Sequence, residues 1–224
     1  MAEKTKGEAQ YQPVIELIKH RPQRLGVSSG WGWYDDPKRL AFCLSRYKFV
    51  SKMLQGRERA LEVGCGDGFY SRIVRQAVGS LVAVDFDADF IASAKEVMDE
   101  RWTIDFRLHD MLEGGVAGSF DAIYSLDVFE HIPAEQEDLF LRNLTAPLER
   151  HGVVIIGAPS LESQAYASQI SKDGHVNCKS QEDFRKVLQK HFHTVFMFSM
   201  NDEVVHTGFS RMSHYNIGLC CERV

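Results

Sequence analysis

Apolar residues fall at two kinds of spacing along this 224-residue chain, and the two kinds alternate. Apolar positions recur every three or four residues between Lys38 and Leu54, which predicts an amphipathic helix over residues 38–54. Further along, short apolar runs predict strands at residues 60–63, 81–84, 104–108, 120–126, 153–157, 194–198 and 215–221. Helical spacing separates most of them, at residues 69–78, 88–101, 134–145 and 180–190. This order predicts an α/β fold with a doubly wound sheet, whose last two strands pair antiparallel because no helix joins them.

Three segments show no strand or helix pattern of this kind and are predicted to be loops. Residues 28–37 are rich in glycine and aromatic side chains, and Asp36 with Pro37 then starts the next helix. The three aromatic residues of this loop either pack over the core or form a lid over a pocket; they are Trp31, Trp33 and Tyr34. Residues 161–179 are polar and predict a loop that faces the substrate, and residues 201–208 predict a turn.

A glycine cluster follows the first predicted strand and is the strongest local signal in the chain. Gly64, Gly66 and Gly68 permit positive φ angles and let a ligand approach the backbone closely. The next strand ends on Asp85, where nucleotide-binding βαβ units place a carboxylate for ribose hydroxyls. The pair predicts a nucleoside site at the carboxyl ends of two adjacent parallel strands, although tight glycine turns also occur for packing reasons alone.

The segment Glu62-Val63-Gly64-Cys65-Gly66-Asp67-Gly68, followed by Asp85, resembles the first two motifs of class I S-adenosylmethionine-dependent methyltransferases. Dinucleotide-binding domains space their glycines G-x-G-x-x-G to seat a pyrophosphate, whereas this spacing is G-x-G-x-G behind an acid. The carboxylate of Glu62 would repel a phosphate but suits a cationic ligand.

The resemblance implies a seven-stranded mixed Rossmann-like sheet with an N-terminal helical cap. It divides the chain into an extension with a cap helix, residues 1–55, and a methyltransferase domain, residues 56–224. The cofactor-binding residues that it implies are Glu62, Gly64, Gly66, Gly68, Asp85, Phe86, Asp110, Met111 and Leu126. For Asp110, which the family pattern assigns to the adenine, a helix N-cap is the alternative.

Residues 125–133, at the exit of the fourth strand, are most similar within this superfamily to the ubiquinone-biosynthesis O-methyltransferases. His131 and Asp127 are the predicted catalytic residues, because an imidazole titrates near neutrality and can take a proton from an acceptor hydroxyl. The alternative for His131 is an imidazole at a helix start that is hydrogen-bonded to backbone.

A divalent cation is a further hypothesis for the same strand exit. Asp127, Glu130 and His131, with His175 from a later loop, form a mixed oxygen and nitrogen set that suits magnesium, manganese or zinc. The set resembles an acid-x-x-Glu-His pattern of small-RNA 2′-O-methyltransferases and some ubiquinone-pathway enzymes, although Asp127 stands where they usually carry glutamate. The alternative is a structural glutamate near a helix start. His175 and His206 are also expected to close over the methyl group.

Composition narrows the classes of partner. The net charge of −5 gives no global attraction to nucleic acid or anionic membrane, and no apolar stretch is long enough to span a bilayer. Five cysteines without metal-site spacing, together with a charged N-terminus lacking a signal-peptide core, predict reduced thiols in a cytoplasmic protein. The oligomeric state is left open.

The sequence therefore predicts a methyltransferase that uses S-adenosylmethionine to O-methylate a hydroxyl of a small molecule or sugar. N-methylation is the alternative among enzymes. A binding module that keeps the cofactor pocket without independent turnover is the alternative from another class.

Overall fold

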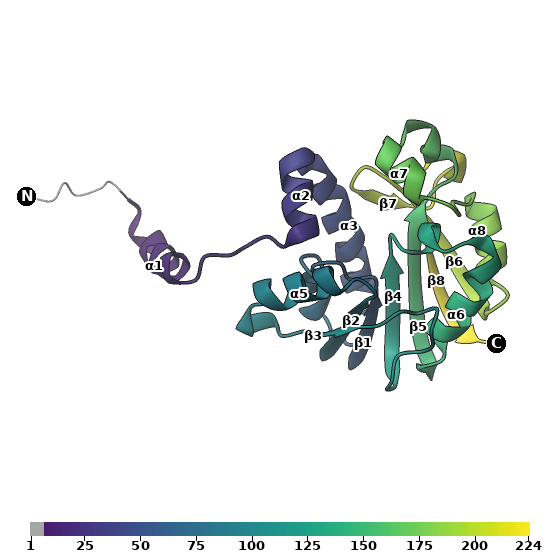
Figure 1. Cartoon of the computed structure of the whole chain (residues 1–224), viewed down its shortest axis with the longest axis horizontal. Coiled ribbons are helices and arrows are strands. Elements are labelled where there is room, and N and C mark those ends of the chain that lie inside the picture. Colours follow the sequence, from purple (N-terminus) through teal and green to yellow (C-terminus); the bar gives the residue numbers. More distant parts are fainter. Residues whose placement is uncertain (1–6) are drawn as a thin grey trace, which may run out of the picture.

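One eight-stranded sheet organises the chain, which the computed structural model describes from residue 7 to residue 224 (Figure 1). Its strands are β1 (Arg59–Val63), β2 (Ser80–Asp85), β3 (Asp105–Leu108), β4 (Phe120–Leu126), β5 (Leu148–Pro159), β6 (Phe192–Asn201), β7 (Val204–His206) and β8 (Tyr215–Arg223). The order across the sheet is β3-β2-β1-β4-β5-β8-β6-β7. Strands β1 to β5 pair in parallel, and β8 lies antiparallel between β5 and β6, which confirms the predicted closing pair.

The central strands are mostly apolar because helices cover both faces of the sheet. The helices are α1 (Gln12–His20), α2 (Val27–Asp35), α3 (Pro37–Met53), α4 (Ser71–Arg75), α5 (Ala88–Val97), α6 (Glu137–Thr145), α7 (Gln169–Gly174) and α8 (Gln181–Leu188). One buried cluster joins α6 and α8 to alternate strand positions such as Leu61 and Ile123. The other joins α3, α4 and α5 to the positions between them, such as Ala60 and Tyr124.

The predicted number of seven strands is wrong by one. Residues 201–208 were expected to form only a turn, but Val204–His206 pairs antiparallel with the end of β6 as β7. The hairpin turns at Asp202, whose φ is 47°, a conformation that aspartate tolerates better than most residues. The short apolar pair Val204-Val205 lacked the length that identifies a strand from sequence alone.

Residues 28–37 are not a loop, because most of them belong to helix α2. Gly30 and Gly32 oppose helix formation, but contacts from outside the segment fix its first turn. The backbone N–H and the hydroxyl of Ser29 both donate to Asp67 Oδ2 at 2.7 Å, and Ser29 Oγ accepts from the N–H of Gly26 at 2.9 Å. Tertiary contacts thus outweigh local propensity here. The predicted cap of α3 is confirmed, since Asp36 Oδ1 accepts from the N–H of Lys38 at 3.2 Å.

The segment 161–179 is also more regular than predicted, since it contains α7 and the 3₁₀ turn Glu162–Tyr166. Figure 1 shows α1 standing away from the sheet on an extended linker, while α2 and α3 pack beside the ends of the strands. The structure does not confirm an N-terminal cap over a cofactor, and residues 1–6 of the predicted extension lie outside the described part. Within residues 7–224, no helix has the length and hydropathy needed to span a bilayer.

The topology decides where a ligand can bind. The strand order reverses between β1, which continues to β2, and β4, which continues to β5. In open α/β sheets, the crevice beyond the carboxyl ends of the strands at such a reversal is the usual ligand site. The glycine cluster and Asp127 lie directly after β1 and β4, at this position.

Candidate functional site

The glycine cluster forms a tight turn in which all three glycines have positive φ angles. Gly64, Gly66 and Gly68 have φ angles of 83°, 53° and 70°. A Cβ on Gly64 would lie 2.0 Å from Val128 Cγ2, and one on Gly68 would lie 2.3 Å from Phe106 Cζ. A Cβ on Gly66 would meet only Ser28 Oγ, at 3.4 Å. Of the three glycines, Gly66 is therefore the one around which the surrounding protein leaves the most room.

Asp85 connects the end of β2 to the glycine loop. Its Oδ2 accepts the N–H of Gly66 at 2.8 Å, and its Oδ1 accepts the N–H of Asp87 at 3.0 Å. Each carboxylate oxygen can accept a second hydrogen bond. The side chain therefore holds the loop and keeps acceptor capacity for hydroxyl groups of a ligand. The neighbouring Phe86 is 76% exposed and lies next to this carboxylate in the chain.

The residues expected at the adenine follow β3. The N–H of His109 donates to the carbonyl of Asp85 at 2.9 Å, which keeps this segment beside the end of β2. Asp110 Oδ1 accepts the N–H of Leu112 at 2.8 Å, so the side chain stabilises a turn and does not cap an α-helix. Met111 and Leu126 are buried in the core. Their contribution to a cofactor site would come from the backbone.

Glu62 faces the core and not an open surface. Its carboxylate accepts the hydroxyls of Tyr47 and Tyr124, each at 2.8 Å, and the residue is 1% exposed. Burial raises the pKa of the Glu62 carboxyl, against the effect of these hydroxyl donors. The side chain links α3 to β1 and β4 beneath the glycine loop. The structure thus shows the Glu62 carboxylate bound within the protein, and its predicted contact with a cationic ligand stays a prediction.

Asp127 is bound by two residues that sequence reasoning missed, Arg46 and Tyr215. Both carboxylate oxygens of Asp127 accept from Arg46 Nη1, at 2.7 and 2.8 Å. The Arg46 guanidinium carbon lies 3.8 Å from the centre of the Tyr215 ring, and the N–H of Asp127 donates to the Tyr215 hydroxyl at 3.1 Å. Asp127 has a φ of 57°, and such strain in a residue other than glycine often marks a functional site. The only sequence signal for Arg46 was a charge beside the apolar stripe of residues 38–54.

Glu130, His131 and His175 form a cluster in which one ligand atom from each residue lies within 4.8 Å of the others. His131 Nε2 is 3.9 Å from Glu130 Oε1, and the two imidazole rings are 5.2 Å apart between centres. The backbone carbonyl of Glu130 accepts the N–H groups of Val176 and Asn177, at 2.9 and 3.0 Å. The structure thus brings three of the four predicted metal ligands together, while the fourth, Asp127, is paired with Arg46.

The hydrogen bonds of the two imidazoles define which ring nitrogen of each histidine is available to accept a proton or bind a cation. His131 Nδ1 lies 2.8 Å from the carbonyl of Gly174, which accepts and requires the proton on Nδ1. His175 Nδ1 lies 2.9 Å from Gln164 Oε1, which accepts in the same way when the amide oxygen faces the ring. Both Nε2 atoms are then free to accept a proton or bind a cation, as in histidines whose second nitrogen is oriented by a carbonyl.

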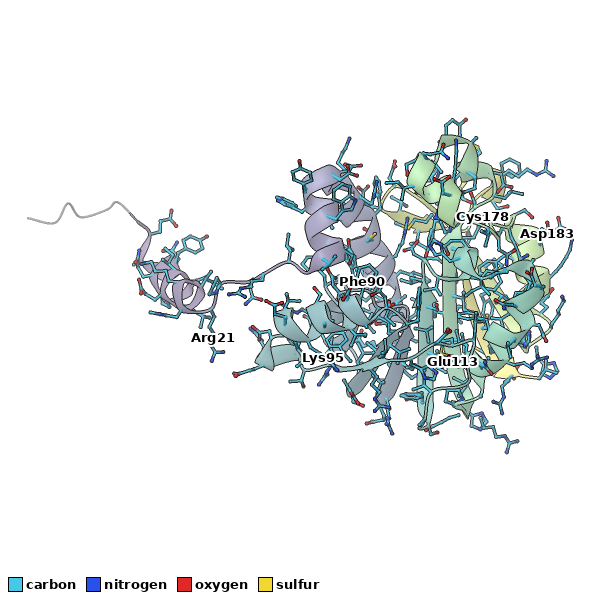
Figure 2. The ribbon with its side chains drawn as sticks, viewed as in Figure 1. Arg21, Phe90, Lys95, Glu113, Cys178 and Asp183 are labelled. Atoms are coloured by element: carbon cyan, nitrogen blue, oxygen red, sulfur yellow. The ribbon has the colours of Figure 1, made fainter. Side chains whose placement is uncertain are left out.

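The charge state of the cluster follows from its burial. Glu130 is 1% exposed, and its Oε2 has no hydrogen-bond partner among residues 7–224. Burial, followed by the negative charge of Asp127, raises the pKa of the Glu130 carboxyl well above its ordinary value. Burial and the neighbouring His131 lower the pKa of His175. A positively charged ligand between these groups would neutralise the negative charge of the buried Glu130 carboxylate. Cys178, labelled in Figure 2, marks the segment just after His175, at the end of the molecule where β4 and β5 finish.

The remaining predicted groups lie around this end of the sheet. Trp31, Trp33 and Tyr34 are 51%, 59% and 82% exposed, so they do not pack into the core. His206 sits in the β6–β7 hairpin, where its Nδ1 accepts the N–H of Gly208 and its Nε2 donates to Asn201 Oδ1. Both ring nitrogens of His206 are therefore used in the hairpin, which leaves neither for an acceptor.

Comparisons with known proteins give the same assignment as the geometry. Residues 60–152 match the family model described as a methyltransferase domain. The ubiquinone biosynthesis O-methyltransferase of Xanthomonas axonopodis pv. citri is 27% identical over 113 residues, which are 48% of this chain and 47% of that protein. The mitochondrial ubiquinone biosynthesis O-methyltransferase of Schizosaccharomyces pombe is 27% identical over 158 residues, 65% of this chain and 56% of that protein.

These matches support the assignment as a class I S-adenosylmethionine-dependent methyltransferase, with the family model covering residues 60–152. The resemblance read from the glycine and acid motifs is thereby confirmed. This methyltransferase chain spans about half the length of the first of these curated relatives. Among solved structures, the N-methyltransferase NodS from Bradyrhizobium japonicum WM9, in complex with S-adenosyl-L-homocysteine, matches with a TM-score of 0.63 and 19% identity. The match covers 86% of this chain and 91% of NodS and shows a shared fold.

Proposed function

We propose that this methyltransferase transfers a methyl group from S-adenosylmethionine to a hydroxyl of a small molecule or sugar. The observation that supports this most directly is the cluster of Glu130, His131 and His175, two of which follow β4, the strand that pairs with β1. A hydroxyl is a weak nucleophile until its proton leaves, so an O-methyltransferase needs a base or a cation near the acceptor. This cluster offers either.

The cofactor supplies an activated methyl group on a sulfonium. The chain positions the cofactor and the acceptor and takes the proton from the acceptor hydroxyl. Asp85 would accept hydrogen bonds from the ribose hydroxyls, with Gly66 leaving room for the nucleoside. Asp110 and Phe86, after the two neighbouring strands, would border the adenine. His131 would then take the hydroxyl proton on Nε2, because its Nδ1 proton is held by the Gly174 carbonyl.

A divalent cation fits the same cluster. The buried Glu130 Oε2 has no partner among the described residues, and two imidazole Nε2 atoms stand beside it. One carboxylate with two imidazoles is a donor set that suits zinc or manganese better than magnesium. A cation held by Glu130, His131 and His175 would lower the pKa of an acceptor hydroxyl. Asp127 is not included in this proposed set, since its carboxylate is bound to Arg46.

For the domain organisation, we retain residues 1–55 as an extension with a cap and residues 56–224 as the catalytic domain. Contacts of α2 with the glycine loop support a cap, since Ser29 binds Asp67 and Ser28 lies near Gly66. The five free thiols support a reducing compartment such as the cytoplasm.

The test is transfer of labelled methyl from S-adenosylmethionine to a panel of catechols, phenols, sugars and amines. Labelling of hydroxyl acceptors supports the proposal, and labelling of amines alone would replace it with N-methylation. Retention of cofactor with no labelled product from either the panel or a cell extract would indicate a binding module. Full turnover of metal-free protein in excess chelator would remove the cation and leave His131 as the base.

A further inference from the structure

Gln164 is a half-buried glutamine that contacts one histidine of the proposed site. It belongs to the 3₁₀ turn Glu162–Tyr166, and its Oε1 lies 2.9 Å from His175 Nδ1. Its Nε2 donates to the carbonyl of Ser160 and to Ser163 Oγ, each at 3.2 Å. The side chain therefore connects the end of β5 to one imidazole of the cluster.

The neighbours of Gln164 fix which end of its amide faces the ring. A backbone carbonyl can only accept, so the carbonyl of Ser160 requires the amide nitrogen. The hydroxyl of Ser163 already donates its proton to that carbonyl, at 2.8 Å, so Ser163 Oγ is also an acceptor toward Gln164. Because both acceptors lie on one side, the amide nitrogen faces them and the amide oxygen faces His175.

Ser160, which orients Gln164, is itself held by the sheet. It is fully buried and directly follows β5. Its N–H donates to the carbonyl of His214 at 2.9 Å, and its hydroxyl donates to the carbonyl of Ser213 at 2.6 Å. These two residues directly precede β8, the strand that pairs with β5. A chain of hydrogen bonds thus runs from two adjacent strands through Gln164 to the imidazole of His175.

The direction of this chain decides the tautomer of His175. An amide oxygen only accepts, so the ring must carry its proton on Nδ1 and its lone pair on Nε2. In the other tautomer, the lone pair of Nδ1 would face the lone pairs of the Gln164 oxygen, and the two acceptors would repel each other. The carbonyl of Gly174 selects the same tautomer of His131.

We propose that Gln164 is a positioning residue, which holds His175 in the Nδ1–H tautomer and leaves the Nε2 lone pair for a proton or a cation. This inference rests on the proposed O-methyltransferase function and names the residue outside the cluster that prepares His175 for it. A hydrogen bond on the second ring nitrogen fixes both the tautomer and the orientation of a functional histidine. Gln164 acts only through His175.

The test reads the tautomer by long-range ¹H–¹⁵N correlation NMR of protein labelled with ¹⁵N-histidine, at pH 8, where an ordinary imidazole is neutral. His175→Asn identifies the signals of this ring among the nine histidines. The parent should show Nδ1–H alone, and Gln164→Leu should show a mixture of both tautomers. Gln164→Glu keeps an oxygen acceptor and should restore Nδ1–H. The matched control is Gln169→Leu, since Gln169 lies in the same segment but donates to Asp173 at 2.6 Å; it should change nothing.

A second arm measures the consequence at Nε2. Zn²⁺ affinity in calorimetry and the rate of methyl transfer should each fall by about 10- to 100-fold in Gln164→Leu and recover in Gln164→Glu. Affinity for S-adenosylhomocysteine should stay at the parent value, because Gln164 is not among the proposed cofactor residues. Equal losses in both variants, with Nδ1–H in each, would show a merely structural role and overturn the inference.

Two results from the spectra would also overturn it: Nε2–H in the parent, or Nδ1–H unchanged in Gln164→Leu. Thermal melting identifies a variant that is not folded, and the parent spectrum remains decisive in that case. Failure of the parent to methylate any hydroxyl acceptor would instead refute the proposed function. Normal turnover, with a tautomer of His175 that does not depend on Gln164, would refute only the positioning role.

Discussion

Replacement of Gly64 by alanine should destabilise the protein, because the added methyl group would collide with Val128 in the segment after β4. Gly64 has a φ of 83°, and the added Cβ would lie 2.0 Å from Val128 Cγ2. The left-handed backbone costs a residue with a side chain about 1–2 kcal/mol. Relief of the overlap by shifts of Val128 and its neighbours costs about 1–3 kcal/mol more. The expected loss in the free energy of unfolding is therefore about 2–5 kcal/mol.

A double-mutant cycle separates the two costs. Val128→Ala removes the atoms that the new methyl would meet, so Gly64→Ala in that background should retain only the backbone cost of about 1–2 kcal/mol. Urea unfolding followed by far-ultraviolet circular dichroism gives all four free energies. Strictly additive effects would refute the reasoning, because they would mean that Val128 does not lie against the glycine loop.

Three further predictions concern the cofactor, the cluster and the cap. Asp85→Ala should weaken S-adenosylhomocysteine binding by about 1–3 kcal/mol, because ribose hydroxyls lose their acceptor; unchanged affinity in calorimetry would remove this assignment. Burial raises the pKa of Glu130, so its ionisation opposes folding as pH rises above the ordinary glutamate pKa. With chelator at pH 8, Glu130→Gln should therefore melt above the parent, and the difference should shrink in acid; Zn²⁺ should raise the melting temperature of the parent only. Protease cleavage within residues 25–35 should slow when cofactor is added, and equal rates would mean that α2 is not a lid.

The fold was largely predictable because its signals are local. Each central strand contains a mostly apolar run of four to seven residues, and the helices that cover the sheet show their own periodicity. The errors fall where distant contacts decide the local structure. Helix α2 contains two glycines and forms against Asp67, 38 residues away from Ser29. Strand β7 has three residues and depends on its pairing with β6.

The site divides in the same way. The link between Asp85 and Gly66 was predictable because both belong to one βαβ unit with a known geometry. Arg46 and Tyr215 were not, since they lie 81 and 88 residues from Asp127 in the chain. A sequence pattern identifies the acid after β4, but only the fold shows which positively charged side chain forms an ion pair with that acid.

The pairing of Asp127 changes the chemistry that the neighbouring cluster can perform. With Asp127 held by Arg46, the cluster retains one carboxylate and two imidazoles, three donors and not four. Structural zinc sites are closed by four protein ligands, whereas catalytic sites keep a position for water or substrate. A cation held by Glu130, His131 and His175 would have such an open position, and an acceptor hydroxyl could occupy it. If the proposed cation is bound, the salt bridge between Asp127 and Arg46 would thus keep the Asp127 carboxylate away from it and leave a position for an acceptor hydroxyl.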